Sequence, residues 1–493
     1  MEQAWSAGYI VDVGYTEGFY REQAPGTLRL VALFAGLRAV DTDRPFTYYE
    51  LGCGNGYTTA LLAAVHPHAQ FVGVDFNPTH IGNARRLAEA AGLANVRFVE
   101  QSFADLVQAE KAEADIIAFH GVWSWINDEN RRHILEFIRQ RLKPGGFVYV
   151  SYNALPGLAQ VAPLQRLLLE HGNLGAGERT ERVKQSVEFA ARLQQAGGLY
   201  FAASPLAKSR MESFKRLDPR YLAHEYYNDN WSLFYHADVA RDMAEARLSY
   251  AGSGNFIDNF TQFALRPELA KIVAEIADPA LAETVKDFAR NAVFRRDVFI
   301  RGASKAPRPE LEASLQAMRF ALARPRAACK LSEKTGAGEV TMQAEAYAPV
   351  LDALARAPMS FEELARAPEL VGFDVNKLRQ GLFGMAALGN VWPALPAAAE
   401  AAARQGAARF NKAVLGRPEQ PGGIWLASPV LGSGVPLATV DRVLLHAHPK
   451  PEQGVEHVRK VLGEPKEGAP LEERVKRFYS DVLPFLRQLG VTD

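Results

Sequence analysis

The stretch ELGCGNG, residues 50–56, is the most informative part of the first half of the chain. The residues before it, TYYEL at 47–51, have the composition of a short buried strand. Glycine occupies every second position of the stretch, so the backbone there can turn sharply and a ligand can contact it directly. A carboxylate, Glu50, stands in front of the glycines. The stretch therefore predicts a ligand-binding loop between a strand and a helix.

The residues around this loop alternate between strand-like and helix-like segments. Strands are expected at residues 47–51, 71–76, 96–100, 115–120 and 147–152, helices at 58–65, from Pro78 to near Gly92 and at 129–142, and a turn at LKPGG, 142–146. Asn77 and Pro78 supply an N-cap and a first helical residue. This alternation predicts a parallel sheet with helices on both faces and a ligand at the carboxyl ends of the strands.

The spacing of the glycines distinguishes between two classes of nucleotide ligand. The dinucleotide fingerprint G-x-G-x-x-G/A fails, because its sixth position is Tyr57 when read from Gly52 and Thr59 when read from Gly54. Glycines at 52, 54 and 56 behind Glu50 resemble instead the first motif of class I S-adenosylmethionine methyltransferases. A pyrophosphate needs a tight helix N-terminus, whereas a methionine tail and a ribose need an open loop. Cys53 lies inside this loop and is expected in the cofactor site.

Asp75 ends the second expected strand, and the resemblance gives it the role of binding the ribose hydroxyls. Charged hydrogen bonds of this kind contribute roughly 1.5–3 kcal/mol each. The alternative is that Asp75 caps the next helix, although Asn77 already occupies that cap position. Phe76 follows Asp75 and is expected to line the same cofactor site. Glu50 either meets the methionine amino group or orients the glycine loop.

Two further segments contribute expected cofactor contacts. In SFADL, 102–106, Ser102 is aligned with the acidic residue that meets the adenine amine in many relatives, and Phe103 either walls the adenine or belongs to the core. In FHGVWSWI, 119–126, His120 and Gly121 are expected beside the methionine part of the cofactor. The Asn/Asp-Pro-Pro-aromatic motif of base-modifying amino-methyltransferases is missing there, which argues against a nucleic-acid acceptor.

The aromatic side chains near the expected reaction centre have two interpretations. Trp123 and Trp125 either line the acceptor channel or belong to the core. HEYYNDNW, 224–231, contains Tyr226 and is the best candidate for a substrate-side loop. The N-terminal stretch GYTEGFYREQAPGTLR, 14–29, is expected to fold over the cofactor with Tyr15, Phe19 and above all Tyr20, unless these rings only fix the terminus to the core.

The strands that complete such a sheet are expected far along the chain, near residues 248 and 297. The segments are therefore interpreted as 1–44, a cofactor-covering segment; 45–155, the first part of the core; 156–229, a helical insertion over the substrate or at a dimer contact; 230–303, the rest of the sheet; 304–395, a winged-helix-like domain; and 396–493, a C-terminal domain.

The winged-helix interpretation is based on helices at 346–355, after a capping box at Ser360–Glu363, and after Asp374, followed by a strand-like VWPAL. The third helix carries only Lys377 and Arg379 as basic residues, so protein docking or regulation is favoured over DNA binding. Residues 394–409 are expected to form a helix or linker. The C-terminal amphipathic helix is interrupted by Pro484.

Three longer stretches point to one group within the class I methyltransferases. HEYYNDNWSLFYHADVA (224–240), FRRDVFIRG (294–302) and ASPVLGSGVPL (427–437) resemble methyltransferases with a regulatory domain, including rickettsial outer-membrane protein-lysine methyltransferases. The resemblance implies S-adenosylmethionine as cofactor, an open cavity, dimers, and lysine side chains of proteins as acceptors.

Composition is consistent with this class. The 493 residues are 48% hydrophobic, and 56 basic residues balance 56 acidic ones, without the basic excess of a dedicated duplex binder. The sequence predicts no signal peptide and no transmembrane segment, and its two cysteines form no metal motif. These features favour a soluble cytoplasmic protein of several domains.

The implied reaction is an in-line attack of a neutral lysine amine on the sulfonium methyl group. Burial would keep the amine neutral, and Trp123, Trp125, Tyr226 or Tyr227 would hold the product ammonium. His120, His224 or Glu225 are candidates to accept the proton. The alternatives are a small-molecule N- or O-methyltransferase and a non-catalytic scaffold that retains the cofactor.

Overall fold

The computed structural model describes residues 18–214, 216–417, 423–463 and 468–493, and its centre is a seven-stranded sheet. The strands are β1 (Thr47–Leu51), β2 (Gln70–Asp75), β3 (Val96–Glu100), β4 (Ala114–Phe119), β5 (Leu142–Asn153), β6 (Leu248–Ser253) and β7 (Phe294–Arg301). Their order is β3-β2-β1-β4-β5-β7-β6, with only β7 antiparallel to its neighbours. The predicted Rossmann-like sheet, resumed near residues 248 and 297, is confirmed.

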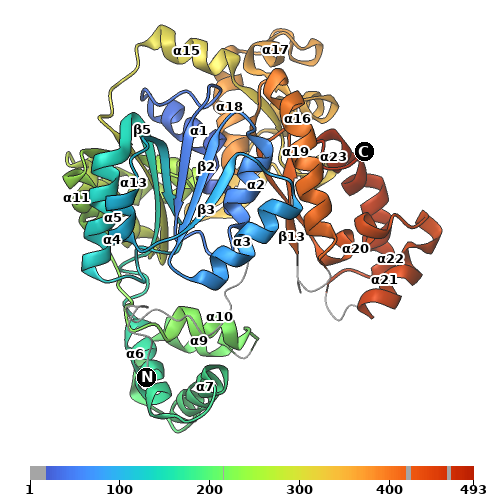
Figure 1. Ribbon diagram of the computed structural model, residues 1–493. Coiled ribbons are helices and arrows are strands. Elements are labelled where there is room, and N and C mark those ends of the chain that lie inside the picture. The colour runs from blue at the N-terminus through green and yellow to red at the C-terminus, as the bar shows by residue number, and fades with distance from the viewer. Residues whose placement is uncertain (1–17, 215, 418–422, 464–467) are drawn as a thin grey trace.

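Helices cover both faces of the sheet because its strands are apolar on both sides. Successive residues of β1 show this, since Tyr48 belongs to one hydrophobic cluster and Tyr49 to another. One face carries α1 (Pro25–Ala35), α2 (Tyr57–Val65) and α3 (Pro78–Ala90), and the other carries α4 (Phe103–Ala109), α5 (Asp128–Arg141) and α11 (His236–Glu245) (Figure 1). Strand order reverses at β1 and β4, so the loops after these strands flank a crevice at their carboxyl ends.

The segment 142–146 does not form the predicted turn but begins β5. Leu142 pairs with Ala114, and the next pair is Phe147 with Ile116, so extra residues bulge out of the longer strand. Pro144 has no backbone N–H to give to a ladder, and Gly145 adopts a φ of 78°. A bulge accommodates both features without ending the strand.

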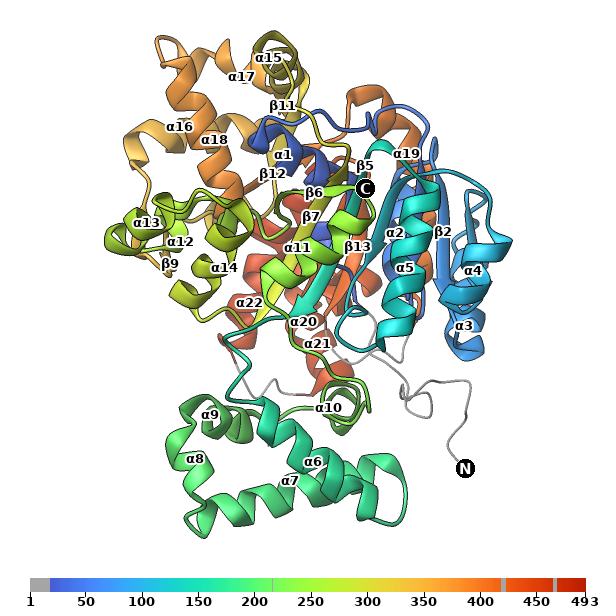
Figure 2. The same ribbon diagram turned by 90° about the vertical axis from the view of Figure 1, so that its left-hand side faces the viewer.

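The helical insertion forms a separate small body at one end of the sheet. It contains α6 (Ala162–Leu174), α7 (Arg179–Gln195), α8 (Leu199–Ala203), α9 (Pro205–Phe214) and α10 (Pro219–Tyr226) (Figure 2). These helices share a hydrophobic cluster of their own. The chain leaves and re-enters the sheet at one place, because the Phe234 N–H donates to the Asn153 carbonyl and the Leu155 N–H to the Phe234 carbonyl.

A second excursion lies between β6 and β7. It consists of η3 (Phe256–Asn259), α12 (Thr261–Ala264), α13 (Pro267–Ala274) and α14 (Pro279–Arg290). α14 packs on α11, and α12 and α13 join α14 in a small apolar cluster. The excursion thereby extends the sheet domain beside the edge formed by β6.

Residues 304–395 contain the three helices and small sheet expected of a winged-helix-like unit. The elements are α15 (Arg308–Ala317), β8 (Arg319–Leu322), η4 (Arg326–Ala328), β9 (Ser332–Thr335), β10 (Gly338–Thr341), α16 (Ala344–Arg356), β11 (Met359–Ser360), α17 (Phe361–Ala365), η5 (Pro368–Leu370), α18 (Val375–Ala387) and β12 (Val391–Ala394). The sheet order is β11-β8-β12. The capping box at Ser360 and the Asp374 cap are both formed, as predicted.

The C-terminal residues pack on the sheet domain instead of standing apart from it. They form α19 (Ala397–Leu415), β13 (Ile424–Ser428), β14 (Ser433–Leu437), α20 (Thr439–Ala447), η6 (Pro451–Gln453), α21 (Gly454–Leu462), α22 (Leu471–Arg477), the π-helical η7 (Phe478–Val482) and α23 (Leu483–Gln488). A Cβ at Gly406 of α19 would lie 2.3 Å from the Ala64 carbonyl oxygen of α2. One hydrophobic cluster runs from the sheet to the C-terminus, so packing is continuous across residues 304 and 396.

None of the described helices combines the length and apolarity that a bilayer crossing requires.

Candidate active site

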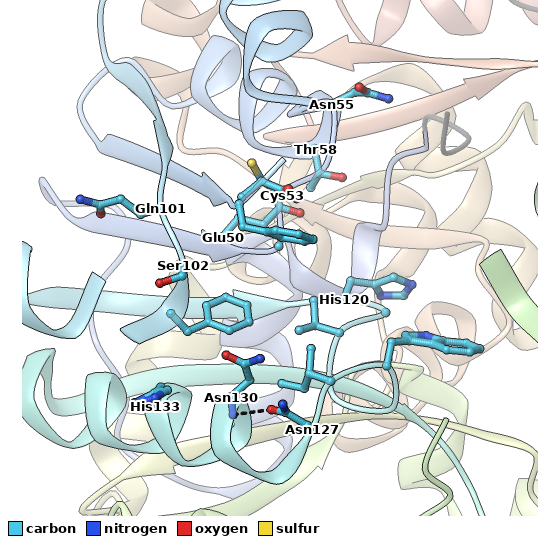
Figure 3. Close-up of a pocket in the computed structure, with 18 of the residues that line it drawn as sticks. Glu50, Cys53, Asn55, Thr58, Gln101, Ser102, His120, Asn127, Asn130 and His133 are labelled. Atoms are coloured by element: carbon cyan, nitrogen blue, oxygen red, sulfur yellow. Dashed lines mark hydrogen bonds between the residues drawn. The ribbon is translucent and has the colours of Figure 1, made fainter. Parts of the chain in front are cut away.

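A cavity of about 370 Å³ lies at the carboxyl ends of β1 to β4. The loops after these four strands line it, together with the N-terminal turn of α5 and the short segment that precedes η2 (Arg21–Gln23) (Figure 3). Among the expected cofactor residues, Tyr20, Glu50, Gly52, Cys53, Asp75, Phe76, Ser102, Phe103, His120 and Gly121 line this cavity. Sequence-distant residues therefore converge at the edge that the strand order predicts.

The glycine loop is shaped by two different requirements. Gly52 has a φ of 72°, and a Cβ there would lie 2.6 Å from Cγ2 of Val122, so the loop after β4 excludes any side chain. Gly54 has a φ of 53° and no atom within 4 Å of its Cβ position, which leaves open space beside the backbone. Gly54 is absent from the cavity wall itself, and its N–H donates to Asp75 Oδ2 at 2.9 Å.

Asp75 joins the glycine loop to the start of α3. Its Oδ1 accepts the Asn77 N–H at 2.9 Å and lies 3.3 Å from His80 Nδ1, while Asn77 caps α3 by accepting from Thr79. The cap of α3 is therefore Asn77, as predicted. Asp75 also lines the cavity, so its carboxylate organises the loop and faces the ligand space.

Glu50 is buried at the end of β1 and has only neutral partners. Its Oε1 accepts from Gln23 Nε2 at 3.3 Å, and its Oε2 accepts from the Thr59 hydroxyl. Burial raises the pKa of Glu50 to about 7, against the opposing effect of these hydrogen bonds. The two alternatives for Glu50 are compatible in this arrangement, because the side chain supports the loop and also lines the cavity.

His120 and Tyr20 form a stacked pair on the cavity wall. Their ring centroids lie 3.5 Å apart with an interplanar angle of 18°, and His120 Nδ1 lies 2.8 Å from the Tyr149 hydroxyl. Burial, with Arg296 nearby, lowers the pKa of His120 to about 3, so the imidazole is neutral at physiological pH. Burial and then Glu225 raise the pKa of Tyr20 to about 12. This part of the wall is thus aromatic and uncharged.

Comparison with known proteins identifies the family. Residues 49–146 match the model described as "Methyltransferase domain", and residues 218–301 match "Predicted methyltransferase regulatory domain". An uncharacterized protein of Synechocystis is 36% identical over 99% of this chain and 100% of its own length. The chain is a class I S-adenosylmethionine-dependent methyltransferase with a regulatory domain. S-adenosylmethionine is its cofactor.

Solved structures and other relatives show how far the methyltransferase likeness extends. The structure of PKMT2 from Rickettsia typhi in complex with AdoHcy superposes with a TM-score of 0.71 and 18% identity, covering 97% of this chain and 99% of that one. An uncharacterized protein of Rickettsia prowazekii is 27% identical over 58% of this chain and 51% of its own length. A tRNA (guanine-N(7)-)-methyltransferase of Nitrosospira multiformis is 28% identical over 21% of this chain and 49% of its own length.

In this methyltransferase, two predicted acceptor-side residues lie elsewhere. Trp123 is fully buried in the hydrophobic cluster beside Phe119 and Phe234, and it does not line the cavity. Tyr226 is buried in the core of the insertion, where it packs on Phe214. For Trp123 the structure agrees with the core interpretation, and Tyr226 packs inside the insertion and does not line the cavity, because each ring is taken up by a local core.

Trp125, for which a channel position and a core position were both open, lies on the cavity wall. It lines the cavity and lies 6.4 Å from Trp231, measured between ring centroids. Gly121 also lines the cavity, and its N–H donates to the Ser151 hydroxyl at 2.8 Å. The loop after β4 is thereby fixed to β5, which holds Trp125 at the rim of the cofactor space.

Ser102 caps a helix at the cavity wall, and Phe103 combines the two interpretations that were open for it. The Ser102 hydroxyl caps α4 by accepting the Asp105 N–H at 3.1 Å, and it donates to Asp105 Oδ2 at 2.7 Å. Phe103 packs against the second hydrophobic cluster and also lines the cavity. Of the other N-terminal aromatics, Phe19 is buried in the core, and Tyr15 lies outside the described residues.

Sequence reasoning missed the contribution of α5. Asn127, Asn130 and His133 line the cavity, and Asn127 caps α5 by accepting the Asn130 N–H at 2.9 Å (Figure 3). The asparagine before the expected helix at 129–142 was a detectable cap signal. That α5 reaches the cavity wall depends on how the helix packs on the sheet, which no local pattern contains. Among the described residues, no group of three or more His, Cys, Asp and Glu side chains is placed to hold a metal ion.

Proposed function

We propose that this methyltransferase transfers the methyl group of S-adenosylmethionine to lysine side chains of a protein. The observation that carries the proposal is the Tyr20–His120 pair, which places a neutral aromatic wall beside the cofactor space. A lysine amine must lose its proton before it attacks, and an uncharged, buried surface lowers the pKa of an amine. The resemblance to rickettsial protein-lysine methyltransferases, over nearly the whole chain, supports the same acceptor.

The proposed cofactor orientation follows from the charges in the cavity. The ammonium group of the methionine part lies at Glu50, which has no cationic hydrogen-bond partner in the described part of the chain. The ribose hydroxyls lie at Asp75, and the adenine lies between the loops that carry Phe76 and Phe103. The sulfonium methyl group then points toward His120 and Gly121.

The proposed acceptor path reaches the methyl group past Tyr20 and Trp125. Aromatic faces attract a methylated ammonium product by about 0.5–2 kcal/mol. His120, with a pKa of about 3, is a weak base at neutral pH, so its role is to position Tyr20. Glu225 is half-buried near Tyr20, and burial raises its pKa to about 7, which makes it the proposed proton acceptor.

The transfer itself is a displacement at one carbon atom. The lysine nitrogen forms a bond to the methyl carbon as the bond from carbon to sulfur breaks, and adenosylhomocysteine leaves. Most of the rate enhancement comes from holding nitrogen, carbon and sulfur in line. The proposed setting is a reducing cytoplasm, as composition and the two scattered cysteines suggest, and the proposed assembly is a homodimer, as the family resemblance implies.

The decisive experiment compares the proteomes of a deletion strain and its parent by mass spectrometry. We expect specific lysine methyl marks to disappear and to return on complementation with the wild-type chain but not with Asp75→Ala. In vitro, incubation of the enzyme and labelled cofactor with a panel of proteins and a panel of metabolites distinguishes the protein methyltransferase from the two alternatives. Label in a metabolite alone identifies a small-molecule methyltransferase. Cofactor binding without any methylated product identifies a scaffold.

A further inference from the structure

A second cavity, of about 510 Å³, lies where the sheet domain meets the winged-helix-like unit and the C-terminal residues. Its wall combines the segment 18–22, residues 254–256 after β6, the end of α18, and the rings of Trp392 and Trp425. This volume is in the range of small-molecule sites in proteins. Gly18 and Tyr20 line this cavity as well as the cofactor cavity.

The charge on this wall is unbalanced. Arg21 has no ion pair among the described residues, and its one hydrogen bond there runs from Nη2 to the Gly434 carbonyl at 3.2 Å. Glu22, the acid on the same wall, pairs with Arg296 at 3.2 Å. Arg324 donates only to the carbonyls of Leu388 and Gly389, at 3.4 and 3.0 Å. Within the part of the chain that the structure describes, two guanidinium groups thus remain without a carboxylate partner at this junction.

The orientation of Arg21 determines which kind of anion fits. Its guanidinium lies close to the rings of Trp392 and Trp425, at 5.4 and 5.7 Å from their centroids, so aromatic rings already contact it and an anion would meet its N–H groups. Arg21 Nε and Trp392 Nε1 are buried donors without an acceptor among the described residues. Buried donors of this kind cost free energy until an acceptor reaches them.

We propose that the second cavity binds a small organic carboxylate with a flat apolar body. The carboxylate accepts hydrogen bonds from the N–H groups of Arg21, because a guanidinium group can donate two parallel hydrogen bonds to a carboxylate. The apolar body packs against Trp392, Trp425 and Phe256. A small shift of Arg21 and Trp392 opens their unpaired N–H groups to the ligand.

The same ligand affects the cofactor site through the segment that both cavities share. Tyr20 presents one side to the second cavity and stacks on His120 in the first. A carboxylate that holds Arg21 therefore restrains the neighbouring Tyr20, and cofactor affinity changes with it. Coupling is reciprocal, so S-adenosylmethionine must change the affinity of the carboxylate by the same factor. The inference is independent of which acceptor is methylated.

The test is calorimetric titration of the full-length chain with phenylacetate and indole-3-acetate, each compared with its uncharged amide. We expect saturable one-site binding of at least one carboxylate, at least about tenfold weaker binding of its amide, and an at least fivefold change in cofactor affinity at saturation. Absence of saturable carboxylate binding, or equal binding of the amides, overturns the site. Unchanged cofactor affinity overturns the coupling.

Variants locate the ligand. Arg21→Gln is expected to weaken carboxylate binding at least tenfold, and Trp392→Phe, which removes one N–H and keeps an aromatic ring, about threefold. The matched control is Arg192→Gln, since Arg192 stacks on Phe189 in the distant insertion. Arg21→Gln unfolds if Arg21 serves only to fix the N-terminal segment. In that case Ala387→Phe, which fills the cavity from α18, still tests whether the ligand binds there. Undiminished binding in folded Ala387→Phe excludes this cavity.

Discussion

Two buried carboxylates in one sheet behave in opposite ways. Glu50, at the end of β1, accepts only from the neutral side chains Gln23 and Thr59, and burial raises its pKa to about 7. Asp297, in the middle of β7, is also fully buried, but Arg295 Nε donates to it at 3.0 Å. Burial alone would raise the pKa of Asp297, but Arg295 together with His236 and Tyr152 outweighs it, so that the pKa falls to about 2. The cation beside the carboxylate makes the difference.

The surroundings of Asp297 show that it is a structural anion. The Tyr152 hydroxyl donates to it at 2.6 Å, His236 Nδ1 lies 2.9 Å away, and Arg295 also binds Asp287 at 2.7 Å. These residues tie β5 and β7 to α11 and α14. The fold supplies a cation to this carboxylate, whereas Glu50 faces a cavity whose ligand brings its own ammonium group. The contrast teaches that a missing counter-ion can mark a ligand site.

The largest expected effect is at the structural carboxylate. Asp297→Leu should lower the free energy of unfolding by about 3–5 kcal/mol, because it leaves a buried guanidinium with fewer partners. Denaturant titration measures the loss. Asp238→Asn is the control, since its ion pair with Arg241 is exposed and should contribute about 0–1 kcal/mol. Equal stability of the two variants would remove the contrast on which the comparison rests.

A substitution at Asp75 tests how much a carboxylate at the cavity contributes to cofactor binding. Asp75→Ala should weaken S-adenosylmethionine binding by roughly 2–4 kcal/mol through lost charged hydrogen bonds and a less ordered glycine loop. Calorimetry on the folded variant measures the change, and Asp75→Asn, which keeps one acceptor oxygen, should lose less. Asp43→Ala, an acid paired with Arg29 away from the cavity, is the control. Wild-type affinity in folded Asp75→Ala would exclude Asp75 from the site.

Glu50 should stabilise the ligand complex and not the empty fold. Its pKa is higher in the folded chain than in the unfolded chain, so its charged form costs stability once the pH rises through about 7. Glu50→Gln should therefore raise the free energy of unfolding without cofactor by about 1–3 kcal/mol at pH 8, and by almost nothing near pH 4.5. Thermal unfolding at both pH values measures whether the substitution stabilises the fold. A lower stability of Glu50→Gln than of the wild type at pH 8 would contradict the prediction.

The smallest expected effect is the pH dependence of cofactor binding. If the cofactor ammonium pairs with ionised Glu50, lowering the pH from 7 to 6 protonates Glu50, and affinity should fall about fivefold. Calorimetric titration at the two pH values measures this. Glu50→Gln should bind more weakly at pH 7 and lose the dependence. A variant that keeps the full pH response would assign the titration to another group.

Local patterns predicted the sheet and the cofactor edge because both depend on short stretches. The strand at 96–100 and the caps at Asn77, Ser360 and Asp374 are formed as predicted, since a few neighbouring residues determine each of them. The segment 142–146 was misassigned because Pro-Gly-Gly favours a turn locally. In the structure Leu142 pairs with β4 at its start and Phe147 pairs with β4 and β7 directly after it, which holds the segment in a bulged strand.

The acceptor side was predicted less well because it depends on packing between distant elements. The sequence gives no means of distinguishing Trp123 from Trp125, two residues apart in one loop, yet the first is enclosed by Phe119 and Phe234 and the second lines the cavity. Tyr226 faces the core of the insertion for the same reason. The part played by α5 and the continuous packing across residue 396 likewise follow from contacts that no short stretch encodes.

The amino-acid sequence by itself determined the parallel sheet, the glycine loop and the carboxylates at its edge, because these depend on periodicity and on conformations that few residues allow. Only the tertiary structure decided which aromatic rings face the ligand and that Tyr20 lines two cavities. It also decided that, among the described residues, no cation pairs with Glu50 whereas Arg295 pairs with Asp297. Charge balance and exposure depend on which side chains the packed elements bring together, and they exist only once the chain has folded.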